Sequence, residues 1–431
     1  MMVSDNYNRG TIALEKGNYE KALQFLKRET YECKEVFLNI GTAYNELGNV
    51  EKAKEYFLKA NDKFVPFMGE TVVGKEYPNA LGNLGLIAYM QWDDELSKNY
   101  CNRALSLDPL HMMSIWNYSL SMLREYCSGL PLHKWAWQMY EYRFKTIATK
   151  VPVNVIPRWD GKSRVKKLVI ITEQGYGDKL MFGRYIEKCE EFCDELVVHC
   201  AKELEKLHDR WTTCNELPLD ADASIPLCSL AAIFGIIDGE WLASKYPRNL
   251  NRDKMRVAVE WAGSKGHKND RNRSCHVGYF NKLVKAFPDI EFVNIRPDSP
   301  KVKGINKILV KDWGDSATEI AKCDLVISVD TSLVHLAGSL GVPCLLMQPL
   351  LNTDFRWGNY KTKLKTGMGI ESNIWYKSVK VLENKGWDKM LDEVILRLDI
   401  IRKEHEIRRW LNGYTVEEFV EEYKKQLNDK H

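Results

Sequence analysis

The sequence predicts an α-helical repeat domain followed by two α/β domains. Three observations lead to this fold class. Glycine and alanine recur at fixed offsets in the first third of the chain, and short apolar runs alternate with helical patterns in the remainder. Between these regions a connector with two prolines, residues 151–161, breaks the helical pattern. The 431 residues are enough for two or three domains with cores of their own.

Residues 1–150 are expected to form helical repeats. Small and aromatic residues recur in three sets, and the third set follows an insertion at residues 64–77. The offsets resemble those of the tetratricopeptide repeat, a helix–turn–helix unit of about 34 residues. The sets are Gly10, Ala13, Gly17, Tyr19 and Ala22; Gly41, Tyr44, Gly48, Ala53, Phe57 and Ala60; and Gly85, Ala88, Ala104 and Pro109. We expect either a concave surface for a protein or peptide partner or a purely structural array.

A fourth, degenerate unit is expected from Met112 to Phe144. It is rich in aromatic residues at helical spacing, which favours a buried junction with the next domain over a surface that stacks a ligand. These residues are Trp116, Trp135, Trp137, Tyr140, Tyr142 and Phe144.

The bulk properties are those of an ordinary globular protein. Hydrophobic residues make up 45% and charged residues 28%, and the net charge of +3 gives no broad attraction to nucleic acid. We find no secretory signal and no apolar run of membrane-spanning length, so a cytoplasmic protein is expected. The 11 cysteines are scattered without a CxxC pair, which predicts free thiols and no zinc site.

The first α/β domain is predicted over residues 151–250. Strands are expected at 167–172 and 196–200, with a helix at 179–192 between them. Gly175 and Gly177 permit a tight turn, but Leu180 stands where a dinucleotide fingerprint needs its third glycine, so a nicotinamide or flavin domain is disfavoured. Asp178 falls in the first helical turn, where it either caps the helix or faces a ligand at the carboxyl edge of the sheet.

The second α/β domain is predicted over residues 251–385, and charged helices that pack across the domains over 386–431. The apolar runs predict strands at residues 256–261, 291–295, 307–310, 325–329 and 344–347, and helices at 279–287 and 316–322. The loop after the first strand carries Lys265, Lys268, Arg271 and Arg273, which suit either a diphosphate or solvent.

A strand–turn–helix pattern at residues 325–341 is the strongest indication of a ligand. Asp330, Thr331 and Ser332 follow the apolar run directly, and His335 lies one turn into the helix. A helix start of this kind offers free N–H groups and the positive end of a dipole to an anion. A phosphorylated ligand is therefore predicted here.

Taken together, these motifs resemble glycosyltransferases that join tetratricopeptide repeats to two Rossmann-like domains in GT-B arrangement, close to the family 9 heptosyltransferases of lipopolysaccharide synthesis. The matching segments are residues 140–144, 159–161, 173–178, 184–185, 261–263, 270–274, 330–341 and 354–357. The chain departs from that pattern at Met181, Phe355 and Lys377, where the bacterial members usually have Gln, Trp and Pro.

The resemblance implies transfer of a sugar from a nucleotide-diphosphate sugar to an acceptor hydroxyl on a glycan, a protein or a modified nucleobase. In this scheme Asp178 is the general base, and the donor diphosphate lies against the residues from Lys265 to Arg273 and from Asp330 to His335 named above. Further residues expected in the cleft are Gln174, Gly175, Gly177, Trp261, Gly263, Asp354, Arg356 and Trp357.

No cofactor or metal is expected in addition to the nucleotide sugar. Asp220 and Asp222 have the spacing of an aspartate pair in metal-dependent transferases, but they lie between predicted elements without further ligands. Two alternatives remain open: a nucleotide-sugar epimerase, and a repeat adaptor whose transferase module has lost its activity. Intact Asp178, Asp330 and His335 argue against the second.

Overall fold

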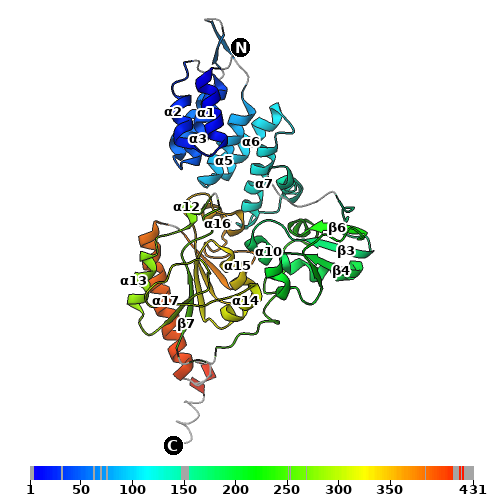
Figure 1. Cartoon of the computed structure of the whole chain (residues 1–431). Coiled ribbons are helices and arrows are strands. Elements are labelled where there is room, and N and C mark those ends of the chain that lie inside the picture. Colours follow the sequence, from blue (N-terminus) through cyan, green and yellow to red (C-terminus); the bar gives the residue numbers. More distant parts are fainter. Residues whose placement is uncertain are drawn as a thin grey trace, which may run out of the picture. The chain divides into compact units, whose positions relative to one another are not determined.

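The chain divides into two compact units in the computed structural model (Figure 1). The first unit contains residues 1–150 and 351–369, and the second contains residues 151–350 and 370–431. The structure describes residues 4–30, 33–61, 64–67, 70–73, 76–146, 155–250, 252, 254–267, 269–383, 385–410, 417–418 and 420–421.

Three helix pairs build the first unit, as the repeats predict. In each pair a glycine of the first helix faces a side chain sixteen positions later (26 − 10, 57 − 41 and 101 − 85). A Cβ on Gly10, Gly41 or Gly85 would lie 2.6, 2.7 and 2.7 Å from Leu26, Phe57 and Cys101, so the small residues set how closely the helices pack. The pairs are α1 (Asp5–Glu15) with α2 (Tyr19–Leu26), α3 (Lys34–Glu46) with α4 (Val50–Ala60), and α5 (Pro78–Met90) with α6 (Asp94–Leu107).

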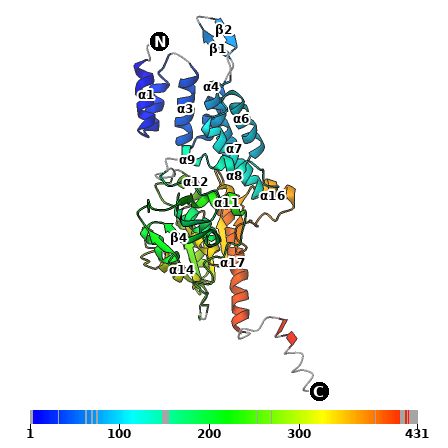
Figure 2. The ribbon, with the colours of Figure 1, turned by 90° about the vertical axis from the view of Figure 1, so that its right-hand side faces the viewer.

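The insertion and the fourth unit complete this region (Figure 2). The insertion contains an antiparallel pair of strands, β1 (Phe64–Phe67) and β2 (Glu70–Val73). The fourth unit consists of α7 (Met112–Tyr126) and the short helices α8 (Ala136–Tyr140) and α9 (Arg143–Thr146). Trp137 and Tyr140 of this unit are buried, whereas Trp135 is exposed.

A segment from far along the sequence belongs to the first unit. Residues 351–369 carry η5 (Phe355–Trp357) and α16 (Tyr360–Thr366). The Tyr140 and Phe355 rings lie 5.8 Å apart, and Asn359 N–H donates to Ser128 Oγ at 2.7 Å. The predicted domain 251–385 is therefore interrupted, because contacts 200 or more residues apart in sequence decide where 351–369 packs.

The second unit contains a parallel four-stranded sheet in the order β5-β4-β3-β6. Its strands are β3 (Val165–Ile171), β4 (Cys193–His199), β5 (Thr212–Cys214) and β6 (Ala223–Pro226), of which β5 and β6 were not predicted. The helix predicted at 179–192 is α10 (Tyr176–Phe182), which passes into the 3-10 turns η1 (Gly183–Tyr185) and η2 (Glu187–Phe192). A Cβ on Gly183 would lie 2.5 Å from the Trp241 ring, and the α-helix ends at this close contact.

A parallel six-stranded sheet follows in the order β12-β11-β10-β7-β8-β9. The predicted strand at 307–310 is displaced to 305–307, because Ile305 is the residue that packs in the core. The strands are β7 (Arg256–Glu260), β8 (Glu291–Asn294), β9 (Ile305–Lys307), β10 (Leu325–Val329), β11 (Cys344–Met347) and β12 (Val379–Leu382). The helices are α12 (Asp270–Arg273), α13 (Gly278–Ala286), α14 (Trp313–Ala321), α15 (Ser332–Ser339) and α17 (Trp387–Trp410).

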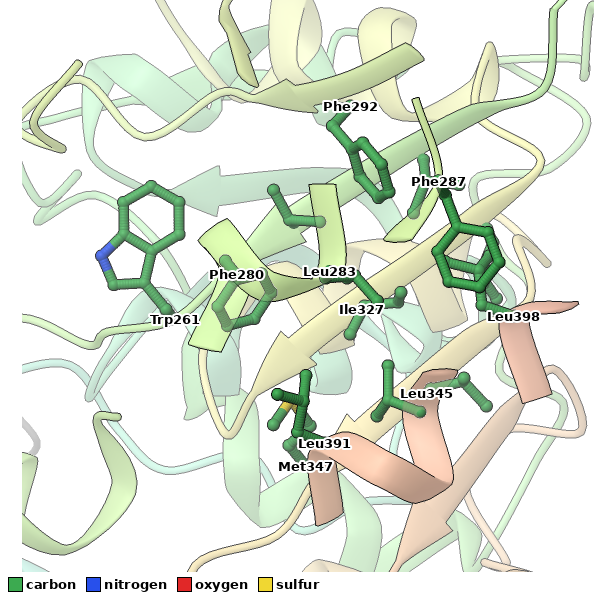
Figure 3. Packing of buried hydrophobic residues seen from close by; sticks show 14 of the residues in the cluster. Trp261, Phe280, Leu283, Phe287, Phe292, Ile327, Leu345, Met347, Leu391 and Leu398 are labelled. Carbon is green, nitrogen blue, oxygen red and sulfur yellow. The ribbon is translucent and has the colours of Figure 1, made fainter. Parts of the chain in front are cut away.

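The core of this domain lies between the six-stranded sheet and helices α13 and α17 (Figure 3). Leu391 and Leu398 of α17 meet Leu345 and Ile327 of the sheet in this cluster. The sequence predicted that the tail packs across domains, but its apolar face enters the core of this one domain. One stripe of apolar residues on a helix fits one hydrophobic surface.

The predicted fold class, helical repeats with two parallel α/β domains, is confirmed. No helix in the described part of the chain has the length and apolar character needed to cross a membrane. All eleven cysteines lie in described segments and carry free thiols.

A buried ion pair gives the first prediction. Arg124 and Asp94 are buried with a 2.6 Å Nη2–Oδ1 contact, and Asn359 donates to the same carboxylate at 2.8 Å. We expect Asp94→Asn to destabilise the protein by about 3–5 kcal/mol in urea unfolding, because it leaves the Arg124 charge buried without a counter-ion. The exposed pair Lys59–Glu55 is the control, and Glu55→Gln should leave the midpoint unchanged. Equal midpoints for both variants would contradict this assignment.

Acid stability should depend on His208. Its ring is buried and stacked on Trp241 at 5.5 Å, and burial lowers its pKa from 6.5 to about 4. Between about pH 6.5 and pH 4, His208 therefore binds a proton in the unfolded chain but not in the folded chain. The free energy of unfolding has its full value above about pH 6.5 and falls by up to about 3 kcal/mol toward pH 4. His208→Phe should reduce this loss in pH-dependent unfolding, and His276→Phe at an exposed position should not. An unchanged acid profile for His208→Phe would refute the prediction.

Candidate functional site

The six-stranded sheet reverses its strand order between β7 and β10. From β7 the chain moves outward to β8 and β9, and it then returns to build β10, β11 and β12 on the other side. Open α/β sheets bind ligands at the carboxyl ends of the strands where the order reverses. The basic loop after β7 and the Asp330–Ser332 turn after β10 stand at this point. The structure joins them, since Arg273 Nη1 donates to the Asp330 carbonyl oxygen at 3.3 Å.

The turn after β10 is built to start a helix. Thr331 is the N-cap of α15, and its hydroxyl accepts from the Leu333 N–H at 3.3 Å. The Ser328 and Thr331 hydroxyls lie 3.1 Å apart, which ties the end of β10 to the cap. Ser332 is the first residue of α15 and His335 the fourth. The predicted strand, turn and helix are confirmed here.

The basic loop is folded back on itself. Gly263 N–H donates to Ser274 Oγ at 2.8 Å, and Ser274 donates to Asp270 at 2.7 Å. A Cβ on Gly263 would lie 2.4 Å from the Arg273 guanidinium, so this glycine makes the room in which Arg273 lies. Lys265 and Arg271 are exposed, and Lys268 falls outside the described residues.

Two further residues at this edge are buried. Trp261, which the sequence placed in the cleft, packs in the core with its ring 5.7 Å from Phe280. Glu260 ends β7, and burial raises its pKa to about 7, although Arg296 at 3.7 Å acts in the opposite direction. Its carboxylate accepts the Ala262 N–H at 3.2 Å and so anchors the start of the basic loop. The sequence did not single out Glu260, because this residue directly follows the apolar residues of the predicted strand.

The four-stranded sheet has its own reversal between β3 and β6. Glu173 follows β3, and its buried carboxylate accepts the N–H of Cys228 after β6 at 3.2 Å. Gln174 next to it has φ of 59°, a left-handed conformation that bends the chain sharply into α10. The predicted glycine turn at 175–177 therefore lies at the carboxyl edge of this sheet, beside the point where the strand order reverses.

Asp178 caps α10. Its Oδ2 accepts the Gly175 N–H at 3.1 Å, as in a capping box. The capping role that the sequence allowed for Asp178 is thus confirmed. The same bond holds the carboxylate at the carboxyl edge of the sheet.

The starts of α10 and α15 pack against each other within the second unit (Figure 1). A Cβ on Gly177 would lie 2.9 Å from His335 Cδ2 and 3.8 Å from Ser332 Cα. With a larger residue at this position the His335 ring would have to move. The contact brings the Asp178 turn of one sheet and the Ser332–His335 helix start of the other to one place, which we call the α10–α15 junction.

Two side chains behind this junction were given no role by the sequence. His335 Nδ1 and the Tyr376 hydroxyl lie 3.1 Å apart, and the Arg184 guanidinium lies 4.6 Å from the Tyr376 ring centre. Arg184 stands in one of the segments that carry the family resemblance, but its contacts with residues 375 and 376 join parts of the chain more than 190 residues apart. The contact between His335 and Tyr376 joins residues 41 apart.

The remaining predicted residues belong to other segments of the chain. Asp354, Arg356 and Trp357 belong to the first compact unit, where Arg356 pairs with Asp354 at 2.5 Å and Trp357 is buried. Asp220 pairs with Lys167 at 2.9 Å, and the Asp222 carboxylate accepts the Lys167 N–H at 2.7 Å. Asp222 directly precedes β6, so this aspartate pair lies at the amino ends of the strands, opposite the edge that carries Asp178.

Comparisons with known proteins identify the repeats. Residues 35–62 match the family model of the tetratricopeptide repeat. The chain is 27% identical over 323 residues to protein FlbA of Caulobacter vibrioides, an alignment that covers 61% of this chain and 52% of FlbA. The chain therefore spans about half the length of this curated relative.

Two solved structures are similar at low identity. An O-GlcNAc transferase of Thermobaculum terrenum is 12% identical, with a TM-score of 0.34 and 99% of each chain covered. The E. coli heptosyltransferase WaaC, solved with ADP-2-deoxy-2-fluoro heptose, is 11% identical, with a TM-score of 0.37, 54% of this chain covered and 99% of its own. The chain thus contains a tetratricopeptide repeat in its helical unit, and two parallel α/β domains make up its second unit.

Proposed function

We propose that the protein transfers a sugar from a nucleotide-diphosphate sugar to an acceptor hydroxyl. The observation that carries this proposal is the α10–α15 junction. It joins the ligand-binding edges of two α/β sheets, one presenting a carboxylate and the other a helix start beside an arginine. Two such edges beside one another can hold two bound molecules in the geometry that group transfer between them requires.

The donor is assigned to the six-stranded sheet. Its diphosphate would lie at the start of α15, against the N–H groups that follow Thr331, with Arg273 nearby. As the bond to the sugar breaks, negative charge grows on the diphosphate. Fixed N–H dipoles and a guanidinium stabilise that charge without rearranging during the reaction. In this scheme they supply the counter-charge that a metal ion provides in other transferases.

The acceptor is assigned to the edge of the four-stranded sheet. Its oxygen attacks the anomeric carbon, and Asp178 takes the proton of the hydroxyl. The bond from the anomeric carbon to the diphosphate oxygen breaks, and its electron pair leaves with the nucleoside diphosphate. General bases of this kind contribute roughly 10²–10⁴-fold to rate.

Donor binding is the first test. A panel of ADP-, GDP-, UDP- and CDP-sugars should include at least one that raises the melting temperature, since a ligand at 100 times its Kd adds about 2.7 kcal/mol. Arg273→Ala should weaken that shift, because the variant loses the bond to Asp330 and the charge at the helix start. Lys282→Ala, an exposed cation on α13, is the control and should behave as the wild type. No shift with any sugar nucleotide would reject the proposal.

The second test addresses Asp178. An asparagine oxygen can still accept the Gly175 N–H, so Asp178→Asn should keep the fold and the donor Kd. Release of nucleoside diphosphate by transfer to water should fall at least about 100-fold, because the base is lost. Asp93→Asn, at the cap of α6, is the matched control and should retain full turnover. Full turnover in Asp178→Asn would remove Asp178 from the role of base.

A further inference from the structure

Three buried side chains form a continuous path to the α10–α15 junction. They are Arg184 and Tyr376, each 3% exposed, and His335, 6% exposed. Arg184 comes from η1 of the first α/β domain, whereas Tyr376 and His335 come from the second. Arg184 also bonds a carbonyl in the last turn of α10, but the contact between the Tyr376 and His335 side chains closes neither a strand nor a helix. That contact calls for another explanation.

Arg184 fixes the far end of this path. Its Nε donates to the Met181 carbonyl at 2.7 Å, and its Nη1 donates to the Trp375 carbonyl at 2.9 Å. These bonds tie the guanidinium to both domains. They also hold it 4.6 Å from the centre of the Tyr376 ring, within the range of a cation–π interaction.

Tyr376 is held with little freedom to rotate. Its N–H donates to Asn373 Oδ1 at 2.8 Å, and its ring lies so close to Gly338 that a Cβ there would come within 2.4 Å. The phenol oxygen lies 3.1 Å from His335 Nδ1. Because the ring and the backbone of Tyr376 are both fixed, its hydroxyl stays directed at Nδ1 of His335.

We propose that Tyr376 is a positioning residue that donates its hydroxyl proton to His335 Nδ1 and so holds the imidazole with its proton on Nε2. The hydrogen bond at one ring nitrogen sets the protonation of the other. A cation at the face of a phenol ring draws electron density from its oxygen, which makes the O–H a stronger donor and a weaker acceptor. Arg184 supplies that cation.

The Nε2–H group then faces the junction. A Cβ on Gly177 would lie 3.5 Å from His335 Nε2, next to the first turn of α10. This tautomer offers a neutral hydrogen-bond donor beside the start of α15, suited to a phosphate oxygen or to the leaving oxygen of a donor. That purpose rests on the proposed function, whereas the tautomer itself does not.

The tautomer can be measured without any substrate. In the full-length chain labelled with ¹⁵N-histidine, long-range ¹H–¹⁵N spectra should show His335 protonated at Nε2, with His335→Gln identifying its signals. Tyr376→Phe keeps the ring and should shift these signals toward a mixture of tautomers. Tyr185→Phe removes another buried hydroxyl, bonded to the Gly235 carbonyl, and should leave them unchanged.

The spectra decide the proposal in every case. A wild-type His335 protonated at Nδ1 overturns it, as does an unchanged His335 signal in Tyr376→Phe. Should Tyr376→Phe fail to fold, the wild-type tautomer decides alone.

Calorimetry with ADP, GDP and UDP adds the functional readout. For the nucleotide that binds, Tyr376→Phe should weaken the Kd roughly 3- to 10-fold, the worth of one hydrogen bond, and Tyr185→Phe should not. An unchanged Kd in Tyr376→Phe would overturn the link between His335 and the diphosphate. If no nucleotide binds the wild type, the proposed function fails while the spectra still judge the positioning role.

Discussion

The close approach of α10 and α15 is the constraint on which the proposed site depends. Gly177 leaves the space that the His335 ring occupies, and a Cβ there would force that ring to move. Neighbouring contacts support the same junction, since Trp241 Nε1 donates to the Leu180 carbonyl at 2.9 Å and to Ser339 Oγ at 3.1 Å. The two α/β domains are thus joined where the carboxyl ends of their strands meet, so the junction is both a structural contact and the proposed reaction centre.

The electrostatics of the junction are local. The whole chain carries a net charge of only +3, yet one helix start, the Arg273 guanidinium and the His335 ring gather at one edge. Buried acidic groups are used as anchors there: Glu173 bonds the chain after β6, and Glu260 bonds the chain after β7. A buried carboxylate with N–H partners fixes loops firmly, because losing those partners would leave its charge unsolvated.

The chain passes more than once between the two compact units. After β11 the chain enters the first unit for residues 351–369 and then returns to form β12. In the first unit this segment is held by buried polar groups, and burial lowers the pKa of Lys363 within it to about 8. The repeat unit therefore contains a segment that lies, in sequence, between two strands of the six-stranded sheet.

The sequence by itself determined the repeats, the parallel strands and the turns at Asp178 and Asp330, because each depends on local patterns of small, apolar and capping residues. It did not predict β5, β6 and β12, which are only three or four residues long, nor the end of α10 at Gly183. Only the tertiary structure decided which residues meet at the junction. Contacts such as Gly177–His335, Tyr376–His335 and Arg184–Trp375 join segments 41 to 191 residues apart, and no local pattern encodes such pairings. The same reason places residues 351–369 in the repeat unit and Trp261 in the core, since burial depends on what packs against a residue from elsewhere in the chain.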